Sequence, residues 1–292
     1  MENSLLGRFP GVIGFPVTPF TRDGAFDAEG FRANVAFMLD SSPAALAFCG
    51  SNGELQSLTL EEYRQVAEEA AAIVKGRTGL ILGAGQTWRA AEEQVRIARR
   101  VGTDAILLMA PYMNDPNEPG LAEYYRRVAG EAGVPVALYQ TKWSGLLSLS
   151  LLERLADVEN ISMVKDEHGS LSHYLQVRLR FGDRFFWVNG MAEPFVPSYW
   201  SLGVTTFTSG LACFIPQVTM EVFERASAGD MQRVNELLNR IIVPLYEIRN
   251  RRPGYKCSMI KSAMNLMGLQ GGFVRPPLVE LQQEDRRDLE RL

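Results

Sequence analysis

The chain has 292 residues, of which 46% are hydrophobic and 22% are charged, and its formal net charge at pH 7 is −4. A chain of this size can bury a large core without a disulfide or a metal, and a single α/β barrel typically takes about 250 residues. This negative net charge argues against the basic surface that is typical of proteins that bind nucleic acid. The N-terminus has no basic segment followed by an apolar core, so no signal peptide is expected.

The cysteines and one long uncharged stretch bear on the cellular location. Cys49, Cys213 and Cys257 lie far apart, without zinc-ligand spacing, so we expect buried free thiols in a reducing, cytoplasmic compartment. The stretch from Pro194 to Met220 carries no charge and is long enough to span a bilayer, but prolines, glycines and hydroxyl residues interrupt it. We interpret it as a buried helix–strand–helix passage and expect no membrane partner.

Short apolar runs alternate with longer helical patterns along the first 228 residues. The predicted strands are 11–16, 44–48, 80–84, 105–109, 135–139, 161–165, 185–188 and 204–208. The predicted helices are 27–39, from 59 onward, 88–100, 120–132, from 150 onward, 171–181, 193–201 and 216–228. Asp27 is a plausible N-cap, and capping boxes at 59–62 and 150–153 indicate two further helix starts.

Eight strand–helix units with strands that are apolar throughout favour a closed parallel (β/α)8 TIM barrel of the α/β class. The alternative is a doubly wound open sheet, but no Gly-x-Gly-x-x-Gly follows the first strand. Residues 230–249 and 255–267 predict further helices. Because no clear linker separates them, we predict a single domain over 1–292, with the barrel in 1–228 and C-terminal helices in 229–292 packed on it.

A lysine ends the sixth predicted strand. The apolar run 161–164 leads into Lys165, and residues typical of turns follow from Asp166 to Ser170. Burial lowers the pKa of a lysine from its ordinary value near ~10.4, and a neutral amine can form a Schiff base with a carbonyl group. The alternative is a structural lysine that reaches solvent or pairs with Asp166 or Glu167.

In a barrel of this kind the active site lies at the C-terminal ends of the strands. The second strand is followed by Gly50-Ser51-Asn52-Gly53, in which two glycines permit a sharp turn and the polar side chains add donors for a substrate carboxylate. An ordinary turn before a helix explains the same residues. Tyr139 ends the fifth strand, which would lie about 4.8 Å from the sixth strand and its Lys165. The phenol could therefore relay protons near the lysine amine, and the alternative is a buried structural tyrosine.

The remaining strand ends carry weaker signals. Asn189 and Ser209 leave small polar groups at the barrel mouth, where they could contact substrate hydroxyls. His168 and His173 have no metal-ligand spacing, and no metal site is predicted. The basic run 248–256 complements a helix C-terminus, and a role in binding an acidic ligand is the alternative. An amine, a phenol and an anion cradle together suit a 2-oxo acid, whose ketone lies beside its carboxylate.

The sequence resembles the dihydrodipicolinate synthase / N-acetylneuraminate lyase superfamily over nearly its whole length. The motifs that carry the resemblance are Pro16-Val17-Thr18-Pro19-Phe20, Gly50-Ser51-Asn52-Gly53-Glu54, Leu58-Thr59-Leu60-Glu61-Glu62, Pro111-Tyr112, Tyr139 and Lys165-Asp166. The resemblance implies that Lys165 is the Schiff-base lysine, that Tyr139 relays protons and that Ser51 and Asn52 bind the substrate carboxylate.

Within this superfamily the C-terminal half resembles the 5-dehydro-4-deoxyglucarate dehydratases, which dehydrate and decarboxylate their substrate to 2,5-dioxopentanoate. The segments concerned are Phe214-Ile215-Pro216, Ile248-Arg249-Asn250-Arg251, Gly254-Tyr255, Lys261 and Val274-Arg275-Pro276-Pro277-Leu278. Four positions depart from the family pattern. Ser144 stands near the place of a synthase arginine, which counts against dihydrodipicolinate synthesis, and the others are Asn52, Met113 and Gln140.

We therefore expect a class I lyase without a cofactor that acts on a 2-oxo-3-deoxy sugar acid, with Lys142 placed to meet the distal carboxylate of a dicarboxylate substrate. The alternatives are a pyruvate-releasing aldolase, a synthase-like enzyme of the same superfamily, and a non-catalytic barrel that binds sugar acids or serves as a scaffold. The resemblance also implies a homotetramer, and the expected partner is a small-molecule 2-oxo acid.

Overall fold

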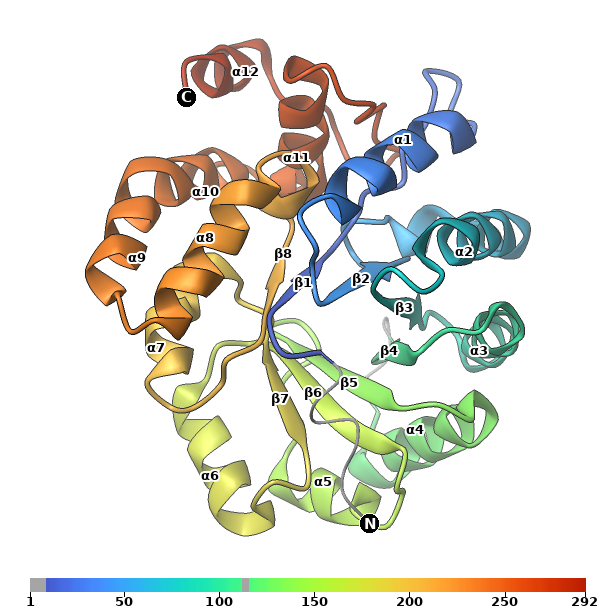
Figure 1. Cartoon of the computed structure of the whole chain (residues 1–292). Coiled ribbons are helices and arrows are strands. Elements are labelled where there is room, and N and C mark those ends of the chain that lie inside the picture. The colour runs from blue at the N-terminus through green and yellow to red at the C-terminus, as the bar shows by residue number, and fades with distance from the viewer. Residues whose placement is uncertain (1–8, 112–115) are drawn as a thin grey trace.

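In the computed structural model, which describes residues 9–111 and 116–292, eight parallel strands close into one barrel in the order β1 to β8 (Figure 1). They are β1 Val12–Gly14, β2 Ala45–Phe48, β3 Gly79–Ala84, β4 Ala105–Met109, β5 Val136–Thr141, β6 Ile161–Glu167, β7 Phe186–Asn189 and β8 Phe207–Ser209. β1 pairs with both β2 and β8, which closes the ring. The (β/α)8 TIM barrel expected from the sequence is confirmed.

A helix follows each strand and covers the outside of the barrel (Figure 1). The helices are α1 Ala28–Leu39, α2 Leu60–Val74, α3 Trp88–Val101, α4 Glu118–Ala132, α5 Leu149–Leu155, α6 Leu171–Phe181, α7 Val196–Trp200 and α8 Pro216–Ser227. The uncharged stretch contains α7, β8 and the start of α8, as predicted. None of the described helices combines the length and the apolar character needed to cross a bilayer.

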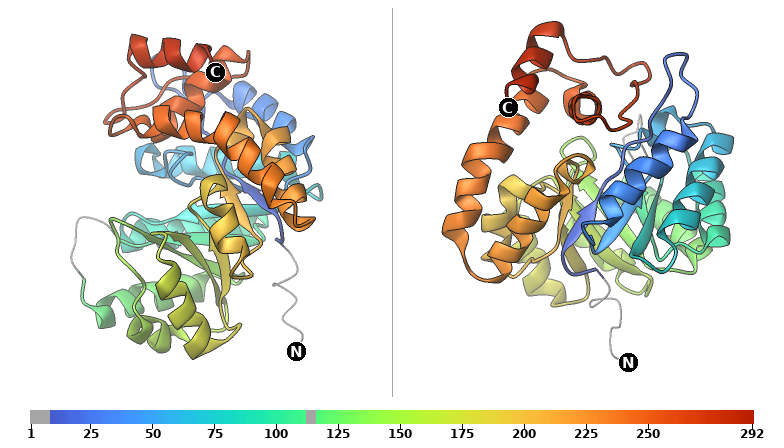
Figure 2. Two further views of the ribbon diagram at one scale, coloured as in Figure 1. Left: turned by 90° about the vertical axis from the view of Figure 1, so that its left-hand side faces the viewer. Right: turned by 45° about the horizontal axis from the view of Figure 1, so that its top comes forward.

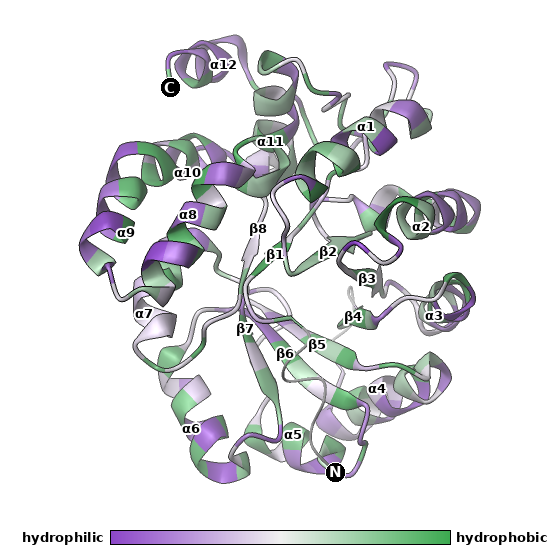
Figure 3. Ribbon diagram, in the orientation of Figure 1, coloured by the Kyte–Doolittle hydropathy of each residue, from purple (hydrophilic) through white to green (hydrophobic). Residues whose placement is uncertain are grey.

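The strands form the buried layer of the molecule. Every residue of β2, β4 and β5 is buried, as expected of parallel strands whose two faces are both covered. Figure 3 shows these strands mainly in the hydrophobic colour, while purple segments recur along the surrounding helices. All three cysteines are buried free thiols, as predicted.

Helix starts agree with the predicted caps in two cases and differ in one. The Asp27 side chain accepts from the Gly30 N–H at the start of α1, and the predicted capping box opens α2. The capping box predicted at Ser150 is wrong, because Ser148 caps α5 by accepting from the Leu151 N–H at 3.0 Å. Both serine hydroxyls donate to the carboxylate of Glu118 on α4, a tertiary contact that local sequence does not reveal.

Further helices extend from the end of the barrel. They are α9 Met231–Leu237, a π-helical turn over Leu238–Ile242, α10 Val243–Asn250, α11 Tyr255–Leu266 and α12 Gln283–Glu290. The helix predicted over 230–249 is thus interrupted by a π turn, and α12 was not predicted. Figure 2 shows this orange and red part of the chain packed along one side of the barrel and across one of its ends. Most of α11 is buried, so the extension shares the core.

Candidate active site

Lys165 lies in β6 directly beside Tyr139 of β5, with which it is in register. Its ammonium nitrogen Nζ is 3.7 Å from the centre of the Tyr139 ring and 5.1 Å from the centre of the Phe15 ring, and 6% of its side chain is exposed. The lysine does not end the strand as predicted, because β6 continues to Glu167. The Glu167 carboxylate accepts a hydrogen bond from Nζ at 2.9 Å.

Burial lowers the pKa of Lys165 to about 8, because the ammonium ion loses solvation. The Glu167 carboxylate acts in the opposite direction, and the positive charges of Lys256 and Arg249 reinforce the decrease. A substantial part of the amine is therefore neutral near physiological pH, and only the neutral form is nucleophilic. Lys165 is both buried and paired with Glu167. The sequence offered a buried amine and a lysine paired with a nearby carboxylate as alternatives, and each describes part of its contacts.

Glu167 joins three polar groups from three elements. Its Oε2 atom accepts hydrogen bonds from Lys165 and from the Tyr139 hydroxyl, and its Oε1 atom accepts one from Lys256 of α11. Burial alone would raise the pKa of this carboxyl, but the charges of Lys165 and Lys256 hold it well below its usual range. Burial and the adjacent Glu167 charge raise the pKa of Tyr139 well above its usual value. The resting site therefore holds a carboxylate and a neutral phenol.

The loop 50–54 closes one side of the same site. Ser51 and Asn52 line the cavity beside Lys165. Cys49 and Glu54, at the two ends of the turn, have positive φ angles of 52° and 50°, so the turn does not depend on glycine φ angles as the sequence suggested. Gly53 is required for close approach, because a Cβ atom there would lie 2.9 Å from the Cys49 nitrogen.

A buried ion pair fastens this loop to the C-terminal helices. The Lys261 Nζ atom of α11 is 2.6 Å from Glu54 Oε1, and neither side chain is exposed. Lys261 also donates to the Phe273 carbonyl oxygen at 2.6 Å, and Glu54 Oε2 accepts from the Arg275 N–H at 3.1 Å. Each buried charge is thus paired and hydrogen-bonded, which is the condition for burying it at tolerable cost.

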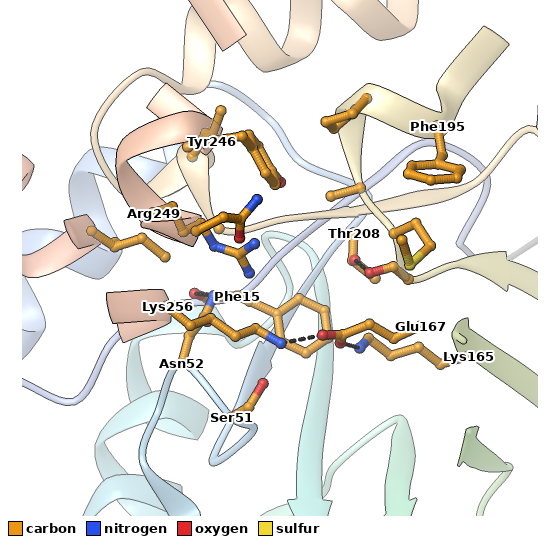
Figure 4. A pocket seen from close by; sticks show the side chains of 18 of the residues that line it. Phe15, Ser51, Asn52, Lys165, Glu167, Phe195, Thr208, Tyr246, Arg249 and Lys256 are labelled. Atoms are coloured by element: carbon orange, nitrogen blue, oxygen red, sulfur yellow. Dashed lines mark hydrogen bonds and ion pairs between the residues drawn. The ribbon is translucent and has the colours of Figure 1, made fainter. Parts of the chain in front are cut away.

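The cavity in front of Lys165 has a volume of about 640 Å³, within the range of pockets that bind small molecules. The barrel supplies one wall, and α10 and α11 supply the opposite wall, as Figure 4 shows for Tyr246, Arg249 and Lys256. Four of the described lining side chains are basic and two are acidic: Lys142, Lys165, Arg249 and Lys256, against Glu167 and Glu247. This balance favours an anionic ligand.

Two predicted contact residues lie behind the cavity wall. Asn189 is buried and donates to the Ala192 carbonyl oxygen at 3.0 Å, and the buried Ser209 hydroxyl donates to the Glu193 carboxylate. Neither residue lines the cavity, and the side chain of Thr208 lies there instead. β8 ends at residue 209, one residue later than predicted, so Ser209 belongs to the strand and not to the loop after it. Successive side chains of a strand point to opposite faces, and Thr208 is the one that faces the cavity.

The other predicted residues and departures divide in the same way. Lys142 lines the cavity, whereas Gly50 lines an adjacent pocket that shares Ser51 and Lys142. Gln140 is fully buried, and its side-chain oxygen accepts from the Leu147 N–H at 3.1 Å, so this departure concerns packing. Tyr112 and Met113 lie outside the described residues. No cluster of three or more metal-ligating side chains occurs in 9–111 and 116–292.

Sequence reasoning missed four cavity residues. Tyr246 and Arg249 come from α10 and Lys256 from α11, and the arginine guanidinium lies 4.9 Å from the centre of the Tyr246 ring. The available signal was the basic run 248–256, which was assigned first to helix termination. Glu167, the fourth missed residue, was assigned to a turn or a structural ion pair.

Comparison with known proteins gives one family and consistent relatives. The model of the dihydrodipicolinate synthetase family matches residues 8–292. A probable 5-dehydro-4-deoxyglucarate dehydratase of Bacillus licheniformis is 33% identical over 285 residues, which cover 97% of this chain and 92% of that protein. A protein of the same printed name from Acinetobacter baumannii strain AB307-0294 is 33% identical over 282 residues, covering 96% and 93%.

Solved structures share the whole architecture. Dihydrodipicolinate synthase from Bacillus clausii has a TM-score of 0.92 at 27% identity, covering 98% of this chain and 97% of that one. A prophage protein of the dihydrodipicolinic acid synthase family from E. coli K12, solved in complex with pyruvate, has a TM-score of 0.88 at 26% identity, with 97% of each chain covered.

Proposed function

This chain belongs to the dihydrodipicolinate synthetase family, and on that premise we propose that it is a Schiff-base-forming dehydratase of a 2-oxo-3-deoxy sugar acid, namely 5-dehydro-4-deoxyglucarate. The observation that carries the proposal is the buried Lys165 amine, whose pKa is lowered to about 8 and which faces a cavity lined by Ser51 and Asn52. A nucleophilic amine beside donors for a carboxylate suits a ketone adjacent to a carboxylate.

The charges of the cavity support a substrate with two carboxylates. Four basic and two acidic side chains among the described lining residues leave an excess of two positive charges, which a dianion would neutralise. Ser51 and Asn52 hold the carboxylate next to the ketone. Lys142 and Arg249, on the loop after β5 and on α10, hold the distal carboxylate.

The reaction begins with an imine between Lys165 and the substrate ketone, with loss of one water molecule. The protonated imine withdraws electrons, so a proton leaves the adjacent CH2 carbon and an enamine forms. The enamine electrons then expel the hydroxyl group on the next carbon, which takes up a proton and leaves as water. The result is an imine conjugated with a carbon–carbon double bond.

Decarboxylation follows from the same electron sink. The electrons of the bond between the distal carboxylate and its carbinol carbon pass through the conjugated system to the imine nitrogen, and CO2 leaves. The intermediate that remains is an enamine conjugated with an enol. The enol becomes an aldehyde as its proton moves from oxygen to carbon, and the enamine carbon takes up one proton, which restores the imine. Hydrolysis of this imine frees Lys165. The sum is one substrate and one proton converted to 2,5-dioxopentanoate, CO2 and water.

Borohydride trapping tests the covalent step. The protein is incubated with pyruvate or with 5-dehydro-4-deoxyglucarate, reduced, digested and analysed by mass spectrometry. We expect a reduced adduct on Lys165, none in Lys165→Met, and wild-type labelling in the control Lys75→Met, whose lysine lies outside the cavity at the end of α2. A wild-type protein without an adduct on residue 165 refutes the proposal and leaves the non-catalytic barrel.

Product analysis separates the dehydratase from the aldolase of the same family. Release of CO2 together with 2,5-dioxopentanoate supports the dehydratase, and both are detectable by 13C NMR with labelled substrate. Formation of pyruvate instead identifies a carbon–carbon bond cleavage. The substrate panel should contain 2-oxo acids derived from hexarates and pentonates, because the two groups differ in the distal carboxylate.

A further inference from the structure

Glu167 presents one oxygen atom to both the Lys165 amine and the Tyr139 hydroxyl. Its Oε2 accepts from the Lys165 amine at 2.9 Å and also from the Tyr139 hydroxyl, and the side chain lines the cavity. Figure 4 shows Glu167 between Lys165 and Lys256, with its carboxylate in contact with both. We propose that Glu167 is a catalytic acid–base residue that carries protons from the Lys165 nitrogen to Tyr139 during imine formation. This inference rests on the proposed Schiff-base chemistry.

The direction of the hydrogen bonds supports this assignment. The Tyr139 hydroxyl donates its proton to Glu167, so in the resting site the phenol is a donor and the carboxylate is the acceptor. Tyr139 can give a proton to a substrate oxygen only if another group replaces it at once. Glu167 is in contact with that hydroxyl and with the nitrogen that must lose protons, so it meets the geometric requirement for a relay.

The neighbouring carboxylate is committed elsewhere. Asp166 is fully buried, and its oxygens accept from the backbone N–H groups of His168 and Gly169 and from the Tyr199 hydroxyl at 2.5 Å. It does not line the cavity, whereas Glu167 does. The two successive acidic residues therefore divide into a structural group on one face of β6 and a reactive group on the other.

The first passage of the relay makes the carbinolamine. The Lys165 ammonium group gives a proton to Glu167, and the neutral amine forms a bond to the substrate carbonyl carbon while the carbonyl π bond breaks. The oxygen takes the Tyr139 proton, and Tyr139 takes the proton held by Glu167. The product has a hydroxyl on carbon and a positively charged secondary amine, while Glu167 is again a carboxylate and Tyr139 again a phenol.

The second passage removes water. The charged secondary amine gives a proton to Glu167, the nitrogen lone pair forms the carbon–nitrogen double bond, and the hydroxyl leaves as water with the Tyr139 proton. Tyr139 then recovers a proton from Glu167. One ammonium group and one ketone have become one protonated imine and one water, so the balance needs no proton from solvent.

Lys256 is the positioning residue of this relay. It binds the other carboxylate oxygen, Oε1, and so holds the side chain with Oε2 directed to Lys165 and Tyr139. Lys256 belongs to α11, outside the barrel strands. The C-terminal extension thereby fixes the orientation of a proton carrier that the barrel provides.

The rate of imine formation separates a proton carrier from a simple counter-ion. Pyruvate is mixed with the protein, and the reaction is quenched with borohydride at increasing times and followed by intact mass. The negative charge of Glu167 opposes the decrease of the Lys165 pKa, so removing only the charge would favour the neutral amine and keep or increase the rate. Loss of a proton carrier has the opposite effect, and we expect Glu167→Gln to be slower by about 10²–10⁴-fold.

The pH profile provides a second readout. The groups facing the Lys165 amine are Glu167 on its own strand, Tyr139 on β5, Arg249 on α10 and Lys256 on α11. Because the relay uses the lysine's own proton, the wild-type rate constant should be constant below about pH 8 and fall above it, where that proton is lost. In Glu167→Gln the neutral amine and solvent protons take over, so the rate should rise with pH towards the amine pKa.

Each failure has its own signature. No adduct in the wild-type protein overturns the Schiff-base function itself, whereas a wild-type adduct with an unchanged or faster rate in Glu167→Gln overturns only the relay. Full labelling of Glu167→Gln after long incubation establishes that the variant is folded and that Lys165 is accessible. In Glu167→Ala, added formate should restore the rate in part, and it should not do so in Tyr139→Phe; equal effects in the two variants contradict the proposal.

Discussion

Replacing Lys261 by methionine tests whether the buried ion pair holds the loop 50–54 in place. The substitution leaves the Glu54 charge without its partner in a site where neither side chain is exposed. It also removes the donor to the Phe273 carbonyl oxygen. Breaking a buried ion pair by removing one partner costs about 3–5 kcal/mol of unfolding free energy.

The expected change in melting temperature follows from the size of the chain. With an unfolding entropy of about 2.1 cal/mol/K per residue, 292 residues give about 0.6 kcal/mol/K, so the loss corresponds to about 5–8 °C. Differential scanning calorimetry measures this shift. The matched control is Arg32→Met, which breaks an exposed pair with Glu69 and should cost less than about 1 kcal/mol.

A double variant identifies the source of the loss. Glu54→Gln combined with Lys261→Met removes both charges and keeps an oxygen that can accept from the Arg275 N–H. Replacing a buried pair by uncharged groups is often close to neutral, so the double variant should recover most of the lost stability, short of about 1–3 kcal/mol for unpaired polar groups. A double variant that melts no higher than Lys261→Met alone refutes the reasoning.

Three further outcomes are expected. Gly83→Ala should lower the melting temperature and weaken binding of pyruvate, because a Cβ atom there would lie 2.1 Å from the carbonyl oxygen of Cys49, which directly precedes the loop 50–54. Calorimetry and equilibrium borohydride trapping measure the two effects, and unchanged values contradict the packing argument. Gly130→Ala, in α4 with open space around its Cβ position, should instead stabilise the protein by up to about 1 kcal/mol, and a decrease in melting temperature contradicts this. Arg275 lowers the pKa of Glu62 to about 2, so the stability that this pair contributes is present above pH ~4.5 and is lost as the pH falls towards 2. In urea unfolding, Glu62→Gln should therefore lose less unfolding free energy over this pH window than the wild type.

The fold was predictable because its signals are local and repeated. The apolar runs of β2 and β4 and the capping box of α2 are formed by residues adjacent in the sequence. They can therefore be recognised without knowledge of the rest of the fold. The predictions fail where contacts between segments distant in the sequence accompany the start or end of an element. Both Ser148 and Ser150 donate to Glu118 of α4, a contact that no local pattern predicts, and the helix begins after Ser148 rather than at Ser150.

The site was predictable from the strands but not from the extension. Strand pairing alone brings Tyr139 beside Lys165, because the ends of neighbouring parallel strands meet at one edge. No local pattern places Arg249 or Lys256 opposite them, since those positions depend on how α10 and α11 cross the barrel mouth. Glu167 was misassigned because its sequence neighbours resemble a turn, whereas the pairing of β5 with β6 extends the strand through it.

The division of the cavity between the barrel and the chain's last helices has a consequence for protein synthesis and for divergence. A ribosome that has released only residues up to Ser227 has produced all eight strands, including Lys165, yet the wall that carries Arg249 and Lys256 is still missing. Part of the basic lining of the cavity is thus encoded downstream of the strand that carries Lys165. Mutations or recombination in the C-terminal helices can alter the charge of that wall while the strands that carry Tyr139 and Lys165 remain unchanged.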